Sequence, residues 1–173
     1  IAGRPHDRIG LVVFGEEAFT QVPLTLDHQS LRSSLRSVEI GVAGSRGTAI
    51  GSAIAVSGKR LKDLEAPERI MILLTDGANN AGRIDPMQAA EAAAALGIRV
   101  YTIGVGQRRS GALSMLMNDG IDERGLTAVA EATGGQYFRA TDERSLQRIY
   151  DTIDELEPST AEVWVRDISL GSS

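Results

Sequence analysis

The feature that most constrains this chain is an unbroken run of apolar residues that ends at a carboxylate. Ile70 to Leu74 are all apolar, and Thr75-Asp76-Gly77 follow directly. A run of this length without polar alternation is typical of a strand buried on both faces, as in a parallel sheet covered by helices. Open α/β sheets bind ligands at the carboxyl ends of such strands. Asp76 is therefore either a ligand-site carboxylate or a residue that caps a turn.

The composition indicates one globular domain. The chain has 173 residues, of which 42% are hydrophobic and 24% charged, as expected for a single folded domain. The net charge of −5 argues against a nucleic-acid partner. There is no cysteine, which excludes disulfides, thiolate metal sites and a cysteine nucleophile. No apolar run approaches the roughly 20 residues of a membrane span, so we expect a soluble fragment.

Periodicity and capping residues predict strands alternating with helices. The expected strands are 9–14, 19–24, 70–74, 98–104 and 136–138, with an extended segment at 161–168, and the expected helices are 28–38, 49–64, 87–96, 122–132 and 142–156. The short link between the first two strands allows only an antiparallel hairpin, with Pro23 at a sheet edge. Strand 70–74, helix 87–96 and strand 98–104 form a parallel crossover. The sequence therefore predicts a three-layer, doubly wound α/β fold whose sheet is mostly parallel, with an antiparallel edge hairpin.

A second polar position follows a glycine-rich loop. Thr48 comes directly after the loop 41–47 and directly before a predicted helix. It is either the N-cap of that helix or a hydroxyl ligand. A hydroxyl and a carboxylate at one sheet edge suit Mg²⁺, which binds hard oxygen ligands and retains several waters. Thr48 and Asp76 are therefore the candidate metal ligands, although two ligands alone do not define a site.

No enzymatic machinery is visible in the sequence. Gly104-Val-Gly106 begins like a dinucleotide-binding loop but lacks the third glycine, and His6 and His28 have no evident metal or triad partner. The long loop 107–120 contains several leucines and methionines, which fit either a short buried helix or an apolar patch that contacts a partner. We therefore expect a chain that is not an enzyme.

Four segments together resemble the von Willebrand factor A (VWA) family, and they are Ile9–Phe14, Ser45–Ile54, Ile72–Gly77 and Ile98–Gly106. The resemblance covers residues 1–157 and is nearest to the bacterial aerotolerance (Bat-like) type, whose members are encoded beside MoxR-type ATPases. It implies a metal-ion-dependent adhesion site (MIDAS) built from an Asp-x-Ser-x-Ser motif, a distant threonine and a distant aspartate. Thr48 and Asp76 match the last two.

The first motif of that site belongs to an initial strand that should precede Ile1. The opening residues, 1–5, are typical of a helix end, so we expect an excised fragment that lacks this strand. The family places the strand between 9–14 and 70–74, so the gap should be filled by a longer parent chain, by the chain's own tail or by another copy. Asp167-Ile-Ser169-Leu-Gly171 resembles the motif with glycine in the last position.

The sequence thus predicts a VWA domain at 1–157 and an extended tail at 158–173. The resemblance implies non-catalytic protein–protein recognition through Mg²⁺, with Mn²⁺ or Ca²⁺ as alternatives, and low occupancy in a fragment without the first motif. A partner would offer an acidic side chain to the ion, and a MoxR-type ATPase or a membrane complex is the candidate. The parent protein would be membrane-anchored with this domain outside the bilayer. The alternatives are a structural domain with a degenerate metal site and a Rossmann-like nucleotide-binding enzyme.

Overall fold

The computed structural model describes residues 6–37, 47–66, 68–77, 79, 81–106, 122–157 and 161–167. The strands are β1 (Ile9–Phe14), β2 (Ala18–Thr25), β3 (Arg69–Thr75), β4 (Ile98–Val105), β5 (Tyr137–Ala140) and β6 (Ala161–Asp167). The helices are α1 (His28–Ser37), α2 (Ile50–Lys62), α3 (Pro86–Ala95), α5 (Glu123–Ala132) and α6 (Glu143–Leu156). The loops predicted at 41–47 and 107–120 lie almost wholly outside the described residues. No helix of the described segments is long and apolar enough to cross a membrane.

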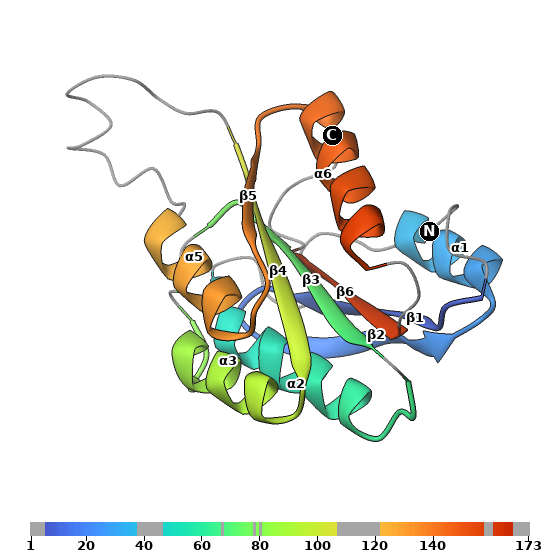
Figure 1. The fold of residues 1–173 in the computed structure, drawn as a ribbon, viewed down its shortest axis with the longest axis horizontal. Helices are drawn as coiled ribbons and strands as arrows, with labels where there is room; N and C mark the ends of the chain where they lie inside the picture. Colours follow the sequence, from blue (N-terminus) through green and yellow to red (C-terminus); the bar gives the residue numbers. More distant parts are fainter. Residues whose placement is uncertain are drawn as a thin grey trace.

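The strands form one sheet in the order β2-β1-β6-β3-β4-β5 (Figure 1). Every neighbouring pair from β1 to β5 is parallel, and β2 is antiparallel to β1 at the edge. Pro23 lies in this edge strand, the position in a sheet where proline is tolerated. The predicted fold class, a mostly parallel α/β sheet with an antiparallel edge hairpin, is confirmed.

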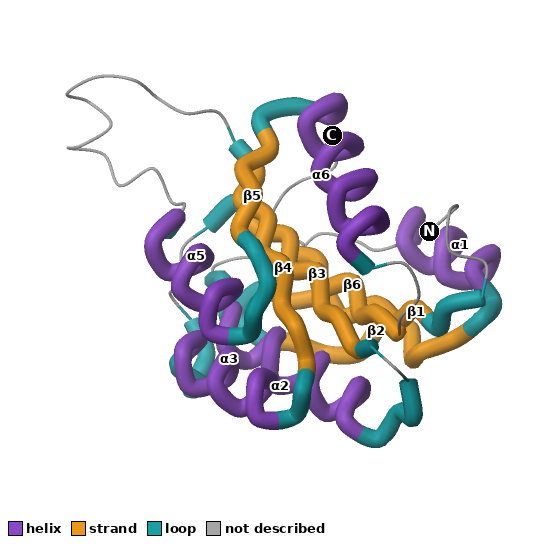
Figure 2. The backbone as a smooth tube through the Cα atoms, in the orientation of Figure 1, coloured by secondary structure: helices purple, strands orange, loops and turns teal. Residues whose placement is uncertain are grey.

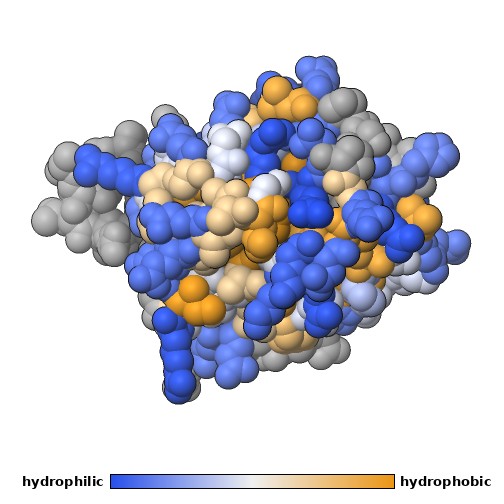
Figure 3. Space-filling model, turned by 60° about the horizontal axis from the view of Figure 1, so that its bottom comes forward, coloured by the Kyte–Doolittle hydropathy of each residue, from blue (hydrophilic) through white to orange (hydrophobic). Residues whose placement is uncertain are grey.

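Helices cover both faces of the sheet, which gives three layers (Figure 2). One face carries α2, α3 and α5, whose buried residues form a single core with β1, β3, β4 and Val165 of β6. Alanines 89, 90 and 93 of α3 are buried in this core, where small side chains permit close packing. On the other face, α6 packs over β3, β4 and β5, and α1 packs over β1 and β2. The outer surface of the first helix layer is largely hydrophilic, with hydrophobic residues scattered among polar ones (Figure 3).

Strand β6 occupies the central position between β1 and β3, which the family gives to the strand that we expected before Ile1. Its residues pair in parallel with β1, from Ile9↔Glu162 to Phe14↔Asp167, and with β3 on its other side. The tail of the chain therefore supplies the strand between β1 and β3, one of the three sources that we expected. The physical reason is that β1 and β3 are buried, and an unfilled slot would leave backbone groups unpaired at about 1–3 kcal/mol each. The division of the chain into a domain at 1–157 and a tail at 158–173 stays a prediction. Part of the predicted tail, β6, is a strand of the sheet.

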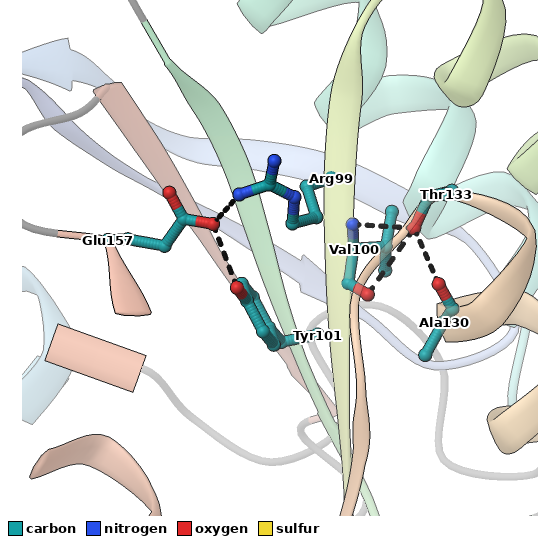
Figure 4. Close-up of polar contacts among 6 residues, drawn as sticks. All are labelled: Arg99, Val100, Tyr101, Ala130, Thr133 and Glu157. Atoms are coloured by element: carbon teal, nitrogen blue, oxygen red, sulfur yellow. Dashed lines mark hydrogen bonds and ion pairs between the residues drawn. The ribbon is translucent and has the colours of Figure 1, made fainter. Parts of the chain in front are cut away.

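At the amino-terminal edge of the sheet, polar contacts fasten two helices to β4 (Figure 4). Glu157, directly after α6, is 1% exposed, and one of its carboxylate oxygens accepts hydrogen bonds from the Arg99 guanidinium and from the Tyr101 hydroxyl, the latter at 2.8 Å. Directly after α5, the Thr133 hydroxyl accepts from the Val100 amide at 2.8 Å and donates to the Ala130 carbonyl. These contacts hold the ends of α5 and α6 on the start of β4.

Candidate functional site

The carboxyl end of β3 places Asp76 at the edge where an open α/β sheet binds ligands. Strand β3 ends at Thr75, whose side chain is fully buried, and the Gly77 amide donates to the Thr75 hydroxyl at 3.2 Å. Asp76 lies between them and is partly exposed. The chain turns as soon as the strand ends, so the carboxylate is carried by a rigid strand end and remains within reach of solvent.

Thr48 lies against this same turn. A Cβ atom placed on Gly77 would be 3.1 Å from the Thr48 hydroxyl oxygen. Because glycine has no side chain, this close approach causes no steric clash. Thr48 itself is 6% exposed. The structure therefore brings Thr48 to the residue that follows Asp76.

Thr48 is not the N-cap of α2, which was the alternative to a ligand role. The N-cap is Ala49, and it makes no side-chain capping bond. The Asn79 side-chain oxygen instead accepts a hydrogen bond from the Ile50 amide at 2.9 Å, so the loop after β3 supplies the acceptor that a capping residue would provide. Sequence reasoning missed Asn79, because a cap that comes from 29 residues away leaves no local signal.

Backbone contacts hold three segments around Thr48. The Ala49 amide donates to the Gly15 carbonyl in the β1–β2 turn at 2.7 Å, and the Ala81 amide donates to the Thr48 carbonyl at 3.3 Å. Farther along α2, a Cβ atom on Gly51 would be 2.0 Å from the Ile84 carbonyl oxygen, so only glycine fits there. The site is thus the meeting point of the β1–β2 turn, the start of α2 and the loop 76–85.

Strand β6 ends beside these segments. Asp167 is the last residue of β6 and pairs with Phe14, and Arg166 pairs with Leu74 of β3. By this register, the backbone of residue 167 reaches the same edge as the Thr75–Asp76 turn. The motif that begins at Asp167 continues into residues outside the described part of the chain.

The side chains at this edge can fill two ligand positions around a hard metal ion. Thr48 and Asp76 offer a hydroxyl and a carboxylate, which are acceptable ligands for Mg²⁺ when waters or a partner complete the octahedron. Among the described residues there is no group of three or more His, Cys, Asp or Glu side chains that could hold a metal ion. The described residues alone would therefore form an incomplete, weak site.

An open hollow lies elsewhere, between α5 and the edge strand β5. Its volume is about 490 Å³, and it is lined by Glu123, Arg124, Thr127, Ala128, Glu131 and Tyr137. Its Glu123 carboxylate accepts hydrogen bonds from Arg139 at 3.0 Å and from Tyr137 at 3.2 Å. This cluster is an internally satisfied network that ties α5 to β5, and it does not resemble a catalytic arrangement.

The von Willebrand factor type A domain family matches residues 1–152, and the chain belongs to this family. Domains of this family are generally protein-interaction modules and are typically not enzymes. The family resemblance predicted from the sequence is thus confirmed.

Similar solved structures include a BatB protein and an aerotolerance-related protein. Conserved hypothetical protein BatB from Bacteroides thetaiotaomicron, known from a crystal structure, is 28% identical in sequence to this chain. The TM-score is 0.73, and the match covers 91% of this chain and 83% of that chain. An aerotolerance-related membrane protein from Bacteroides fragilis is 27% identical, with a TM-score of 0.68, over 85% of this chain and 78% of that one.

A curated relative, an uncharacterized protein of Borreliella burgdorferi, is 30% identical over 157 residues, which are 85% of this chain and 46% of the relative. The chain spans about half the length of the curated relatives it matches.

Proposed function

We propose that this domain recognises a protein partner through a divalent metal ion, Mg²⁺ in the first instance, held by Thr48 and Asp76, and that it catalyses no reaction. The observation that carries the proposal is the approach of the Thr48 hydroxyl to Gly77, directly beside Asp76, at the carboxyl edge of the sheet. A bound ion would supply the positive charge that attracts an acidic side chain of the partner. The ion would occupy this site weakly, because waters must complete most of its ligand shell.

Metal binding alone is the first test, with Mn²⁺ as the probe because its electron paramagnetic signal changes on binding. We expect wild type to bind Mn²⁺ and Mg²⁺ to displace it, whereas Asp76→Ala and Thr48→Ala should each bind at least about tenfold more weakly, the loss of about 1.4 kcal/mol expected for one charged or polar ligand. Glu65→Ala is the matched control, since Glu65 is exposed and follows the opposite end of α2.

Gly77→Ala tests the geometry without removing a ligand. The added methyl group would lie 3.1 Å from the Thr48 hydroxyl oxygen, so that side chain must move by a few tenths of an ångström. We expect weaker Mn²⁺ binding by a folded protein. Unchanged binding in Gly77→Ala and in Asp76→Ala would remove the metal from this site and leave the structural-domain alternative standing.

Asp167→Asn asks whether β6 contributes to the same site. The register places residue 167 at the edge that carries Asp76. A loss of Mn²⁺ affinity would add Asp167 to the ligand set, and unchanged affinity would leave Thr48 and Asp76 as the protein ligands. A nucleotide titration in parallel tests the enzyme alternative, which requires a phosphate site.

The family context offers a candidate for the biological partner. We propose a MoxR-type ATPase or a membrane complex as partner and a membrane-anchored parent protein that holds this domain outside the bilayer. Binding to such a partner should fail in chelator and return with Mg²⁺. A pull-down with the full-length parent protein, with and without chelator and with Asp76→Ala as the negative control, measures this directly.

A further inference from the structure

Among the residues that the structure describes, the exposed large hydrophobic side chains are unevenly placed. Their exposed fractions are 53% for Leu26, 43% for Leu96, 50% for Leu156 and 38% for Ile84. The three leucines lie at the amino-terminal edge of the sheet. Leu26 follows the end of β2, which pairs with the start of β1, and Leu96 directly precedes the turn into β4. Leu156 is the neighbour of Glu157, which contacts the start of β4. Ile84 is the member of this set that lies at the carboxyl edge, where its carbonyl packs against Gly51 near the start of α2.

Charge is also unevenly placed around Thr48. On one side lies the β1–β2 turn, in which Glu16 and Glu17 are exposed and whose Gly15 carbonyl accepts from the amide of Ala49. On the other side lies the loop that donates from Ala81 to the Thr48 carbonyl and then exposes residues 83 and 84, an arginine and an isoleucine. The described rim thus carries two glutamates on one side. On the other it carries an arginine and an isoleucine, followed by Asp85, whose carboxylate caps α3.

This arrangement limits which partner can approach. A partner carboxylate that moves toward an ion at Asp76 also meets Glu16 and Glu17, in a chain whose net charge is −5. Like charges repel unless a positive group accompanies the carboxylate. The partly exposed Ile84 loses contact with water only if the partner covers it with an apolar side chain.

We infer that the rim of the Thr48–Asp76 site selects a partner segment of mixed character, in which a metal-binding carboxylate is flanked by a basic residue facing Glu16 and Glu17 and by an apolar residue facing Ile84. This inference rests on the proposed function, because the carboxylate needs the ion. It adds the partner's chemistry, and it assigns recognition roles to Glu16, Glu17 and Ile84.

The probe is an array of short synthetic peptides, each with one central glutamate and with lysine and leucine on opposite sides at varied spacings. Matched peptides carry glutamine for the glutamate, glutamate for the lysine, or serine for the leucine. Binding is followed by amide NMR spectra of the isotopically labelled protein in Mg²⁺. At least one parent peptide should shift the signals of residues 16, 17 and 84, and each matched change should weaken its binding.

Protein variants complete the experiment. Glu16→Lys with Glu17→Lys should weaken the best peptide about fivefold, as expected for exposed ion pairs. Ile84→Ser should weaken it about tenfold, as expected for the loss of part of one buried aliphatic side chain. Leu96→Ser, an equal change at the opposite edge, should leave binding unchanged.

The result separates the two proposals. If Mg²⁺ shifts the signals of Thr48 and Asp76 but no array peptide binds, or if the glutamate-for-lysine peptides bind equally well, the inference about the rim is overturned and the proposed metal site stands. If Mg²⁺ itself leaves Thr48 and Asp76 unshifted, the proposed function fails first. Peptide-induced shifts confined to the amino-terminal edge also overturn the inference.

Discussion

The two edges of the sheet treat a carboxylate in opposite ways. At the amino-terminal edge, Glu157 is 1% exposed and accepts hydrogen bonds from Arg99 and Tyr101 of the same chain. At the carboxyl edge, Asp76 lies in a partly exposed turn beside Thr48, within reach of solvent. A buried carboxylate that accepts hydrogen bonds from its own chain contributes to the fold, whereas a partly exposed one at a strand end remains accessible to an ion or a partner. The comparison predicts that mutations at the first edge act on stability and mutations at the second act on binding.

The largest expected loss of stability is for Glu157→Ala. The change removes the acceptor of two hydrogen bonds and leaves the Tyr101 hydroxyl buried without it, which should cost about 2–3 kcal/mol of unfolding free energy. Arg99 is partly exposed and can turn to water, which limits the cost. Urea unfolding monitored by circular dichroism measures the change. Glu155→Ala, an exposed acid two residues earlier on α6, should be nearly neutral, and an equal loss in both variants would contradict the assigned role of Glu157.

Gly51→Ala should come next, with a loss of about 1–3 kcal/mol. A methyl group there would lie 2.0 Å from the Ile84 carbonyl oxygen, so the loop after β3 would have to move away from α2. The matched control is Gly58→Ala in the same helix, where the nearest atom is 4.0 Å away. That control should be neutral or stabilising by up to about 1 kcal/mol, since alanine favours a helix. Equal behaviour of the two variants in thermal unfolding would show that the loop does not pack closely on α2.

A smaller effect should appear at alkaline pH. Burial, and then the neighbouring Glu157, raise the pKa of Tyr101 to about 12 from its ordinary value near 10. Because the folded state holds this proton more tightly than the unfolded state, the contribution is fully present below pH 10 and is lost as the pH rises toward 12. Tyr101→Phe should flatten the fall in stability over this window. A steeper fall in the variant, measured by urea unfolding at successive pH values, would reverse the sign that we assign.

The smallest expected change of stability is for Asp76→Ala. The side chain lies at a turn and leaves no apolar cavity, so the unfolding free energy should change by no more than about 0.5 kcal/mol. Asp76→Ala should also lose Mn²⁺ binding. Glu157→Ala should show the opposite behaviour: it should lose stability but keep its affinity for Mn²⁺ when binding is measured below its unfolding transition. A large loss of stability in Asp76→Ala would place Asp76 among the structural carboxylates.

Local patterns made most of the architecture predictable. The unbroken apolar run that contains Ile72 predicts a buried parallel strand, and Asp85-Pro86 predicts the start of α3, where the Asp85 side chain does accept from the Met87 and Gln88 amides. Thr48 and Asp76 were predicted from a glycine loop, a strand end and a family resemblance, and the structure brings their segments together. Their role as metal ligands stays a prediction.

The contacts between distant segments could not be predicted in the same way. Glu157 follows an amphipathic helix and has the pattern of a solvated helix end, yet it is buried because Arg99 and Tyr101 of β4 meet it there. Asn79 caps a helix that begins 29 residues before it. Neither contact leaves a periodic pattern or a motif in the sequence, because each depends on how two distant elements pack.

What the sequence by itself determined is the set of elements, their parallel order around β3 and β4, and the two polar positions at strand and loop ends. These follow from hydrophobic periodicity and backbone geometry, which act between near neighbours in the chain. Only the tertiary structure decided that the last strand lies in the middle of the sheet, between β1 and β3. An extended segment with alternating valines fits an edge, a tail or a centre equally well, and the choice is made by the unpaired backbone groups of two strands far away in the sequence.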